Sequence, residues 1–443
     1  MQKLLGLLDK IVKYLGAALI IIIPLYPKFP FIHIPGTYVS VRVEDFLIVL
    51  VAIYVFIKFV SNLKIHFKNN IVNSIFLFLA VGFISLLSAN LVTGTVTLHI
   101  SLLHFIRRIE YFIPFFLGYL IFRDDKNYKN TLSFLFKSLI IVIIVAFIYG
   151  FGQRYFGWPV IITQDQEYSK GVALKWTSGS HLSSTFAGHY DLASYLVLIL
   201  PTFVVLFFTL GGKTQKIILG SVVIMGLWLL AGTLSRISIL SYFLSTAFAL
   251  FFIKKYKEII FVFILSIILF GSSMNLLGRY SNLRNIFSYL TPTVKAQELL
   301  VSTQKPPVIE DRSTSIRLNA EWPRAIRAFL KNPLLGTGYS SISLATDNDY
   351  LRLLGEVGIL GFSAFVLIIV RVGHLFIRIR PLISSFSKIE QAVITGTAGG
   401  ILGTLLNALF IDVFEASKFV TTFWLMIGMS VYLIQKKLNE QNI

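Results

Sequence analysis

The stretch TDNDYLRLLGEVGILGF, residues 346–362, marks the point where a long polar segment becomes an apolar one. Residues 271–355 are polar, mixed in charge and rich in turn residues, which sets them apart from the rest of the chain. Beyond them an apolar run continues through Gly358. A polar loop of this length is usually functional or disordered. Its aromatic residues, such as Trp322 and Tyr339, argue against disorder, so we expect the loop to be the working part of the molecule.

The composition is typical of a polytopic α-helical membrane protein. Of the 443 residues, 56% are hydrophobic and only 14% are charged, whereas a soluble protein carries about 25% charged residues. Apolar residues come in blocks of about 20, the length that crosses a bilayer as a helix. We predict an all-α membrane protein with about twelve transmembrane helices, at residues 11–26, 45–60, 71–88, 102–122, 134–152, 190–209, 215–232, 235–252, 257–272, 355–378, 391–411 and 417–435. They form one integral membrane domain, residues 1–443, with a large extracytoplasmic loop at 273–354 that contains short helices.

The net charge of +19 is explained by membrane topology. Lys and Arg gather in alternate breaks between the apolar blocks, and basic residues mark the cytoplasmic loops of membrane proteins. We therefore predict that both termini are cytoplasmic and that the chain does not bind nucleic acid. The absence of Cys excludes disulfides, thiolate catalysis and Cys-bound metals. The apolar run before Pro24 has no small-residue cleavage site after it, which indicates a first membrane helix rather than a signal peptide.

Arg236 stands at the predicted outer start of a span, in GTLSRISILSYF (residues 232–243). A guanidinium is costly to bury in a membrane, so it either reaches the interface or meets an anion. Two interpretations are open. Arg236 is an interfacial anchor, or it is a phosphate clamp, because the planar fork of arginine suits a diphosphate better than the point charge of lysine.

The loop carries a predicted cationic helix at residues 313–331. Arg317 and Arg324 are seven residues apart, which places them on nearly the same face of an α-helix, and Arg327 joins that face. Arg312 adds a further positive charge. The helix either binds an anionic substrate at the outer membrane surface or contacts lipid phosphates.

Asp347 and Asn348 precede the span that passes through Gly358 and Gly361. A carboxylate near a helix N-terminus is favoured by the helix dipole, and both residue types are common helix caps. The pair is therefore a simple cap or part of a site. We expect the two glycines to allow close helix packing.

His189 and Asp191 lie at the outer edge of a span and could transfer protons, although a lone interfacial His is more often structural. Arg108, which follows Arg107 and precedes Glu110, is part of a buried ion pair or contacts lipid phosphate. The sequence has no cluster with metal-ligand spacing and no phosphate-binding Gly-Lys loop, so we expect neither a metal nor a nucleotide cofactor.

Together these residues resemble the O-antigen ligase and O-antigen polymerase superfamily, whose members ligate or polymerise lipid-linked glycans. Ligases of this family carry a motif of His, Asn, nine residues and Gly-x-x-Gly. This chain keeps the spacing in Asn348, Gly358 and Gly361 but has Asp347 at the His position.

Other family motifs follow in the same order. Ser235-Arg236 is similar to the Ser-Arg pair at an outer span edge, and Arg317 is similar to the loop arginine that precedes a Trp. The Pro-x-x-Gly-x-Gly turn corresponds to residues 333–338, and the Ser-Thr-Phe segment to residues 184–186. The resemblance covers the chain from about residue 180 onward.

The resemblance implies a multi-pass enzyme of the cytoplasmic membrane that needs no metal. It would transfer an undecaprenyl-diphosphate-linked glycan to a glycan, lipid or protein acceptor on the outer side. Arg236 and Arg317 would stabilise the departing diphosphate, and Asp347 would take the place of the family His as general base. The residues expected to bind substrate are Arg324, Arg327, Asn348, His189 and Arg108.

The competing class is a secondary transporter or lipid-glycan flippase with about twelve spans. Such proteins often contain internal repeats and carry charges in mid-span. This sequence shows no repeat, and its charges lie at span edges and in the outer loop, which favours an enzyme.

Overall fold

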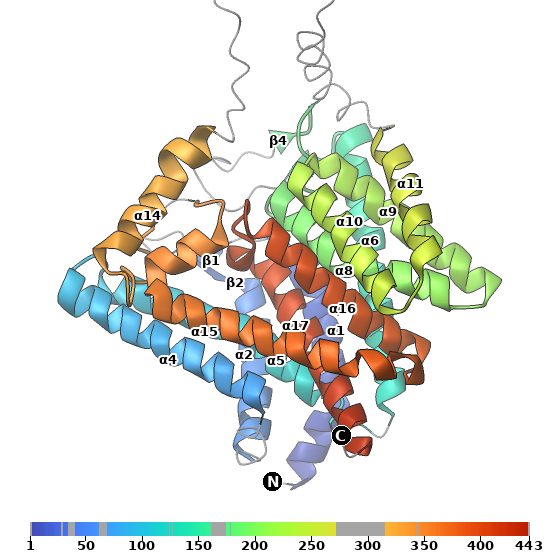
Figure 1. The fold of residues 1–443 in the computed structure, drawn as a ribbon, viewed down its shortest axis with the longest axis horizontal. Coiled ribbons are helices and arrows are strands. Elements are labelled where there is room, and N and C mark those ends of the chain that lie inside the picture. Colours follow the sequence, from blue (N-terminus) through green and yellow to red (C-terminus); the bar gives the residue numbers. More distant parts are fainter. Residues whose placement is uncertain are drawn as a thin grey trace, which may run out of the picture.

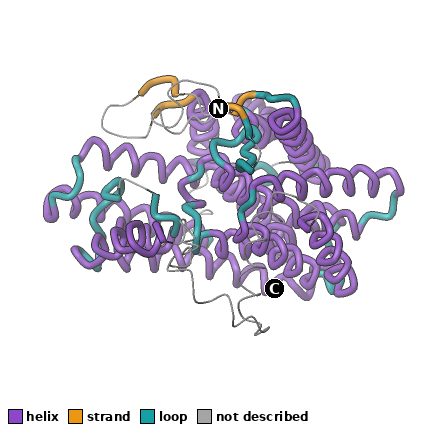
Figure 2. The backbone as a smooth tube through the Cα atoms, turned by 90° about the horizontal axis from the view of Figure 1, so that it is seen from above, coloured by secondary structure: helices purple, strands orange, loops and turns teal. Residues whose placement is uncertain are grey.

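A computed structural model describes residues 2–27, 30–33, 40–61, 69–123, 125, 127–160, 174–177, 179–271, 315–342 and 345–441. This part of the chain is almost entirely helical (Figures 1 and 2). The α-helices are α1 (Gln2–Leu25), α2 (Val43–Val60), α4 (Asn70–Ser88), α5 (Leu98–Leu120), α6 (Tyr128–Tyr155), α8 (His189–Thr209), α9 (Lys213–Thr233), α10 (Arg236–Phe252), α11 (Tyr256–Gly271), α14 (Trp322–Lys331), α15 (Asp349–Ile379), α16 (Lys388–Asn407) and α17 (Ser417–Glu440).

Short helical turns and two small sheets complete the described structure. The turns are η1 (Ala89–Thr93), η2 (Arg317–Glu321), η3 (Arg380–Ser385) and η4 (Val413–Glu415). The sheets each pair two antiparallel strands, β1 (Pro30–His33) with β2 (Ser40–Arg42) and β3 (Pro159–Val160) with β4 (Leu174–Lys175). The sequence interpretation did not predict these strands, which are only two to four residues long.

The helices agree with a multi-pass membrane protein. By length and composition, seven segments of the described chain could cross a membrane, and they comprise α4 with η1, α6, α8, α9, α15 with η3, α16 and α17. Two shorter apolar helices, Ile11–Leu25 and α10, accompany them. A helix lies at each of the twelve predicted segments, while the number that cross the membrane stays a prediction. The first turn of α1 and the last turn of α17 lie at the same end of the bundle (Figure 1).

The last helix, α17, lies at the centre of the molecule (Figure 1). In the apolar stretch of this helix, 94% of the residues are buried inside the protein. It packs against α5, where Gly118 and Gly428 bring the two backbones together, because a Cβ on Gly428 would stand 2.1 Å from the carbonyl oxygen of Phe115. Small residues are the usual means of close helix packing in a membrane.

One lysine at the start of α17 is fully buried. Lys418 is 0% exposed, and its ammonium donates hydrogen bonds to three backbone carbonyls, those of Pro24 at 3.1 Å, Tyr26 at 2.7 Å and Thr185 at 2.7 Å. It also lies 5.5 Å from the ring centroid of Phe186. A buried charge is tolerated only where its hydrogen-bonding capacity is met, and here the three carbonyls join the end of α1 to the segment before α8.

Two further groups of helices flank this centre. On one side α4 and α15 lie side by side and antiparallel, with α14 beside the start of α15; on the other side α8, α10 and α16 pack together (Figure 1). The predicted large loop, residues 273–354, is described only from residue 315 onward, apart from residues 343 and 344. Arg312 and Ser313 therefore lie outside the described residues.

The loop helix differs in one respect from the prediction. It ends at Lys331 before Asn332 and Pro333, as expected, but its described part includes the π-helical turn η2 directly before α14. A π turn has i→i+5 hydrogen bonds, so the seven-residue spacing of Arg317 and Arg324 does not correspond to two regular α-helical turns.

Candidate functional site

The site is built on a break in α15. At Gly358 the backbone leaves the helical region, with φ 64° and ψ −171°. The turn before α15 docks into this break through four backbone hydrogen bonds, from Thr337 N to Gly355 O at 2.9 Å, Gly338 N to Glu356 O at 2.8 Å, Ile359 N to Pro333 O at 2.9 Å and Leu360 N to Leu334 O at 3.2 Å.

Glycines are needed on both sides of this contact. A Cβ on Gly358 would lie 2.3 Å from the carbonyl oxygen of Leu334, and one on Gly336, whose φ is 70°, would lie 2.4 Å from the carbonyl carbon of Glu356. From the sequence, Gly358 was expected to allow close helix packing. Instead, Gly358 and the Pro-x-x-Gly-x-Gly turn form one structural unit, which fixes the loop to the start of α15.

Asp347 and Arg317 form an ion pair at the end of this unit. The Nη2 and Nε atoms of Arg317 donate to Oδ2 of Asp347 at 2.7 Å and 3.0 Å. The side chains are 13% and 22% exposed, so the pair is partly shielded but accessible. The Nη2 atom of Arg317 also donates to the hydroxyl of Tyr190, in the first turn of α8, at 3.3 Å. The fold thus joins the predicted loop arginine to the predicted carboxylate.

The cap of α15 is Asn348, not Asp347. Oδ1 of Asn348 accepts from Leu351 N at 3.0 Å, and its Nδ2 donates to Leu409 O at 3.1 Å. The amide of Asn348, which was expected to bind substrate, is therefore engaged with backbone. This arrangement leaves the helix-capping role to Asn348 and directs the Asp347 carboxylate to Arg317.

Asp412 holds the backbone on both sides of Asp347. Its Oδ2 accepts from Thr346 N at 2.7 Å, and its Oδ1 accepts from Asn348 N at 3.1 Å. Asp347 itself has φ 48°, a left-handed conformation that Asp tolerates better than most residues. The two hydrogen bonds from the flanking amides stabilise that conformation, so Asp412 positions Asp347.

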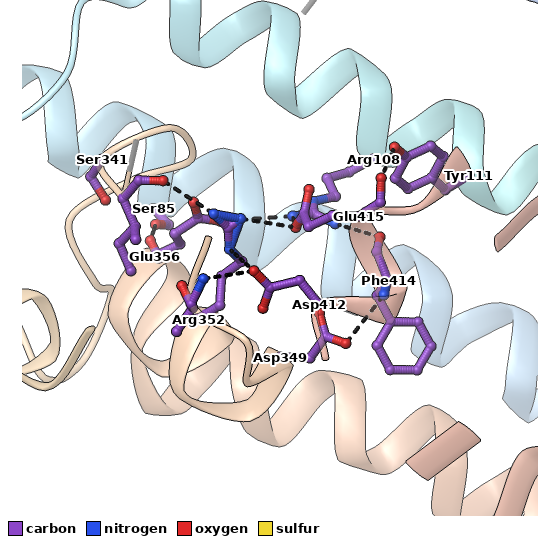
Figure 3. A network of polar contacts seen from close by, with 12 residues as sticks. Ser85, Arg108, Tyr111, Ser341, Asp349, Arg352, Glu356, Asp412, Phe414 and Glu415 are labelled. Carbon is purple, nitrogen blue, oxygen red and sulfur yellow. Dashed lines mark hydrogen bonds and ion pairs between the residues drawn. The ribbon is translucent and has the colours of Figure 1, made fainter. Parts of the chain in front are cut away.

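A deeper polar network supports Asp412 (Figure 3). Arg352, which is 5% exposed, lies with Nε 3.9 Å from Asp412 Oδ2 and with Nη1 4.0 Å from Glu415 Oε1. Arg108 forms an ion pair with Glu415, lies 3.7 Å from Oε2 of Glu356, and donates to Phe414 O at 3.1 Å. Of the two interpretations of Arg108, the structure supports the buried ion pair, which is linked to Asp412 through Glu415 and Arg352.

His189 belongs to a stack that reaches from Arg317 toward Arg236. Its ring lies 4.0 Å between centroids from both His181 and Tyr190. Nδ1 of His181 is 2.9 Å from the carbonyl oxygen of Thr233, the last residue of α9. Arg236 begins α10 after a break of two residues, as predicted, and its side chain is exposed. Successive contacts therefore link the loop pair to the α9–α10 turn.

The remaining loop charges surround the pair unequally. Arg327 is exposed, whereas Arg324 is partly buried and its Nη1 has no hydrogen-bond partner among the described residues. Glu321, the one acid in residues 315–331, was not singled out from the sequence. It lies close enough to Asp347 and Arg317 for charge interactions with both.

Burial makes Asp347 and Glu321 weaker acids. Burial raises the pKa of Asp347, Arg317 opposes this rise, and Asp412 adds to it. Burial and the Asp347 carboxylate raise the pKa of Glu321 to about 7, against the effect of Arg317. Burial alone would also favour neutral Glu415, but Arg108 and Arg352 hold its pKa below the usual range. A carboxylate with a raised pKa is a stronger proton acceptor, as general bases require.

Several residues of the site were missed in the sequence. Tyr190 directly follows His189, and Asp412 lies in the turn between the predicted spans 391–411 and 417–435. In the sequence, Arg352 is simply one charged residue of an amphipathic segment, and nothing nearby marks it as part of a site. Within the described part of the chain, no three His, Asp or Glu side chains are arranged to hold a metal ion.

Comparison with known protein families gives one match. Residues 220–366, from α9 into α15, match the family described as O-antigen ligase. The matched region contains Arg236, Arg317 and Asp347. It supports placing the chain in the O-antigen ligase and polymerase superfamily, and with it a membrane enzyme of that type. No curated protein matches the chain.

Proposed function

We propose that this protein is a glycosyltransferase that moves an undecaprenyl-diphosphate-linked oligosaccharide to a glycan, lipid or protein acceptor. The reaction takes place at the outer side of the cytoplasmic membrane, with both chain termini inside, and uses no metal. The contact between Arg317 and Asp347 carries the proposal, because it combines a phosphate-binding group and a proton acceptor at one partly exposed position.

In the proposed reaction the acceptor hydroxyl oxygen attacks the anomeric carbon of the donor sugar. A new carbon–oxygen bond forms as the bond to the phosphate oxygen breaks, and the undecaprenyl diphosphate leaves with that electron pair. Asp347 accepts the hydroxyl proton. Its raised pKa suits this task, provided that the pH is high enough to keep the carboxylate ionised.

Arg317 would stabilise the negative charge that develops on the departing diphosphate. Preorganised cations contribute most where charge increases in the transition state, and the Tyr190 hydroxyl and the Asp347 carboxylate hold the guanidinium in place. Arg236 would reach the same diphosphate from the first residue of α10, where its side chain is exposed. Arg324 and Arg327 would attract the anionic donor to the loop.

The runner-up function is a twelve-span transporter or lipid-glycan flippase. Purified protein incubated with lipid-linked glycan and an acceptor separates the two, because a transporter leaves the glycan linkage intact. The family match to O-antigen ligases favours the enzyme.

Asp347→Asn is the most direct test of the proposed base. The substitution removes the proton acceptor but keeps an oxygen for Arg317, and Asn348 still caps α15. We expect a loss of transfer of at least about a hundredfold, a typical contribution of acid–base catalysis, while Asp347→His, which restores the ligase motif, should retain activity. Asp125→Asn, in the capping turn before α6, is the control. Unchanged transfer by Asp347→Asn at matched expression would remove Asp347 from the base role.

A further inference from the structure

A cavity lies at the end of α15 that is remote from Asp347. It has a volume of 680 Å³ and is formed by the start of α4, the end of α5, the last turns of α15 and the end of α17. Arg371 lies 22 residues along α15 from its first residue, which corresponds to about 30 Å at about 1.5 Å per residue. The cavity is therefore separate from the candidate site.

The lining of this cavity is cationic. It includes Arg371, His374 and Arg378 of α15, together with Asn69 and Gln435, and none of its described lining residues is acidic. Residues 371, 374 and 378 are three, four and seven apart, so they share one face of the helix. A cavity with two guanidinium groups, amide donors and no carboxylate suits a singly or doubly charged anion.

Part of the lining is held in place before any ligand binds. Asn69 caps α4 by accepting from Ile71 N at 3.0 Å, and its Nδ2 donates to Gln435 Oε1 at 3.4 Å. Arg371 donates to the Ser74 hydroxyl at 2.6 Å and to the carbonyl of Asn70. The wall along α4 is thus fixed by contacts within the protein, and His374 and Arg378, both exposed, complete the opposite side.

Apolar residues next to the cavity indicate a lipid rather than a soluble anion. Val370, which also lines the cavity, is 58% exposed. Toward the middle of the helix this face continues with Val366, which is 36% exposed. The order along the helix, apolar in the middle and cationic at the end, matches a lipid whose phosphate lies at the membrane surface and whose acyl chain points inward.

We propose that this cavity binds the headgroup of an anionic phospholipid, with its phosphodiester between Arg371 and Arg378 and an acyl chain along Val370. Anionic lipids are attracted to basic pockets between membrane helices. This site is independent of the proposed glycan transfer, because it rests on other residues at the other end of α15.

The test compares ligands on the purified full-length protein in a neutral detergent. Phosphatidylglycerol should raise the temperature of thermal unfolding in a saturable way, while phosphatidylcholine and inorganic phosphate should not. An equal effect of phosphatidylcholine would show that any lipid suffices, and an equal effect of inorganic phosphate would identify a free-anion site. Either result would overturn the proposal.

Arg378→Gln and a matched control locate the effect. Arg378 is exposed, so its replacement leaves the packing intact, and the apparent affinity for phosphatidylglycerol should fall about fivefold, the equivalent of about 1 kcal/mol. Arg380→Gln removes the same charge at the same end of the bundle, but the guanidinium of Arg380 lies 4.8 Å from the Phe251 ring rather than lining the cavity. It should retain the affinity of the unmodified protein. Equal losses in the two variants would reduce the effect to general surface charge and refute the cavity.

Discussion

Replacing Gly358 by Ala should separate the loop from α15. The backbone there has φ 64° and ψ −171°, a region essentially restricted to glycine, and another residue costs about 1–3 kcal/mol in backbone strain. The added Cβ would also lie 2.3 Å from the Leu334 carbonyl oxygen and 2.5 Å from Leu335 N. Both are backbone atoms, so the neighbouring chain cannot relieve the overlap by a change of rotamer.

The magnitude follows from what the overlap disrupts. Moving the turn away weakens the four backbone hydrogen bonds between residues 333–338 and the break in α15, each of which contributes about 1 kcal/mol net. Adding the backbone strain gives a total destabilisation of about 5 kcal/mol. Because this turn anchors the chain that leads to Asp347, glycan transfer should be lost together with stability.

The measurement is thermal unfolding of the purified protein, with Gly373→Ala as the control. Gly373 lies in the same helix, and apart from its chain neighbours and its own helix backbone no atom comes within 4 Å of a Cβ placed there. Alanine at such a helical position is favoured over glycine by about 1 kcal/mol, so the control should unfold at the same temperature or higher. If Gly358→Ala unfolds at the temperature of the control and keeps full transfer, the docking of the turn does not stabilise the loop.

Three further outcomes are expected at the candidate site. Arg317→Ala and Arg236→Ala should each slow transfer about a hundredfold, or about 3 kcal/mol. Lysine at either position should restore little activity because it lacks the planar fork of arginine. Near-normal transfer by both alanine variants would return the arginines to an anchoring role. Glu321 is neutral below its pKa and negatively charged above it, so the KM for the anionic donor should rise as the pH passes about 7. This rise should vanish in Glu321→Gln, and a pH profile unchanged by the substitution would contradict a role of Glu321 in donor binding. Asp412→Ala removes two charge-assisted backbone hydrogen bonds, each contributing about 1.5–3 kcal/mol, and should lower kcat much more than it changes the KM for the donor. Asp412→Asn keeps one acceptor oxygen and should recover part of kcat. Equal activity of Asp412→Ala and the unmodified protein would exclude the positioning role.

The helices could be predicted from the sequence because membrane helices are encoded locally. A block of about 20 apolar residues is sufficient evidence for a span, and the α9–α10 break lies where Arg236 indicated it. The helix α15 begins at Asp349, six residues before the predicted span at 355–378, because its first turns are amphipathic rather than apolar. The capping amide of Asn348 shows where the helix begins, but an Asp-Asn pair alone does not show which residue caps.

The site could be predicted only in part, because its contacts join distant segments. The positions of Arg317 and Asp347 came from the resemblance to the ligase motifs, but nothing local shows that the two side chains meet 30 residues apart. Asp412 is 66 residues from Thr346, and its carboxylate accepts a hydrogen bond from the Thr346 amide. This contact forms only because α15 and α16, which lie between the two residues, bring them back together in the fold. The Gly-x-x-Gly pattern was misread for a related reason, since a positive φ at Gly358 leaves no mark in the sequence.

The three carbonyls around the Lys418 ammonium bear on how the chain is completed during synthesis. Pro24 precedes Lys418 by 394 residues, and Thr185 precedes it by 233, so the first helix and the segment leading to His189 leave the ribosome long before their shared partner exists. Until α17 is inserted, those carbonyls must find water or lipid headgroups instead. The contact therefore forms only after α17 has been inserted, and the His189 end of the candidate site acquires its final support at that point.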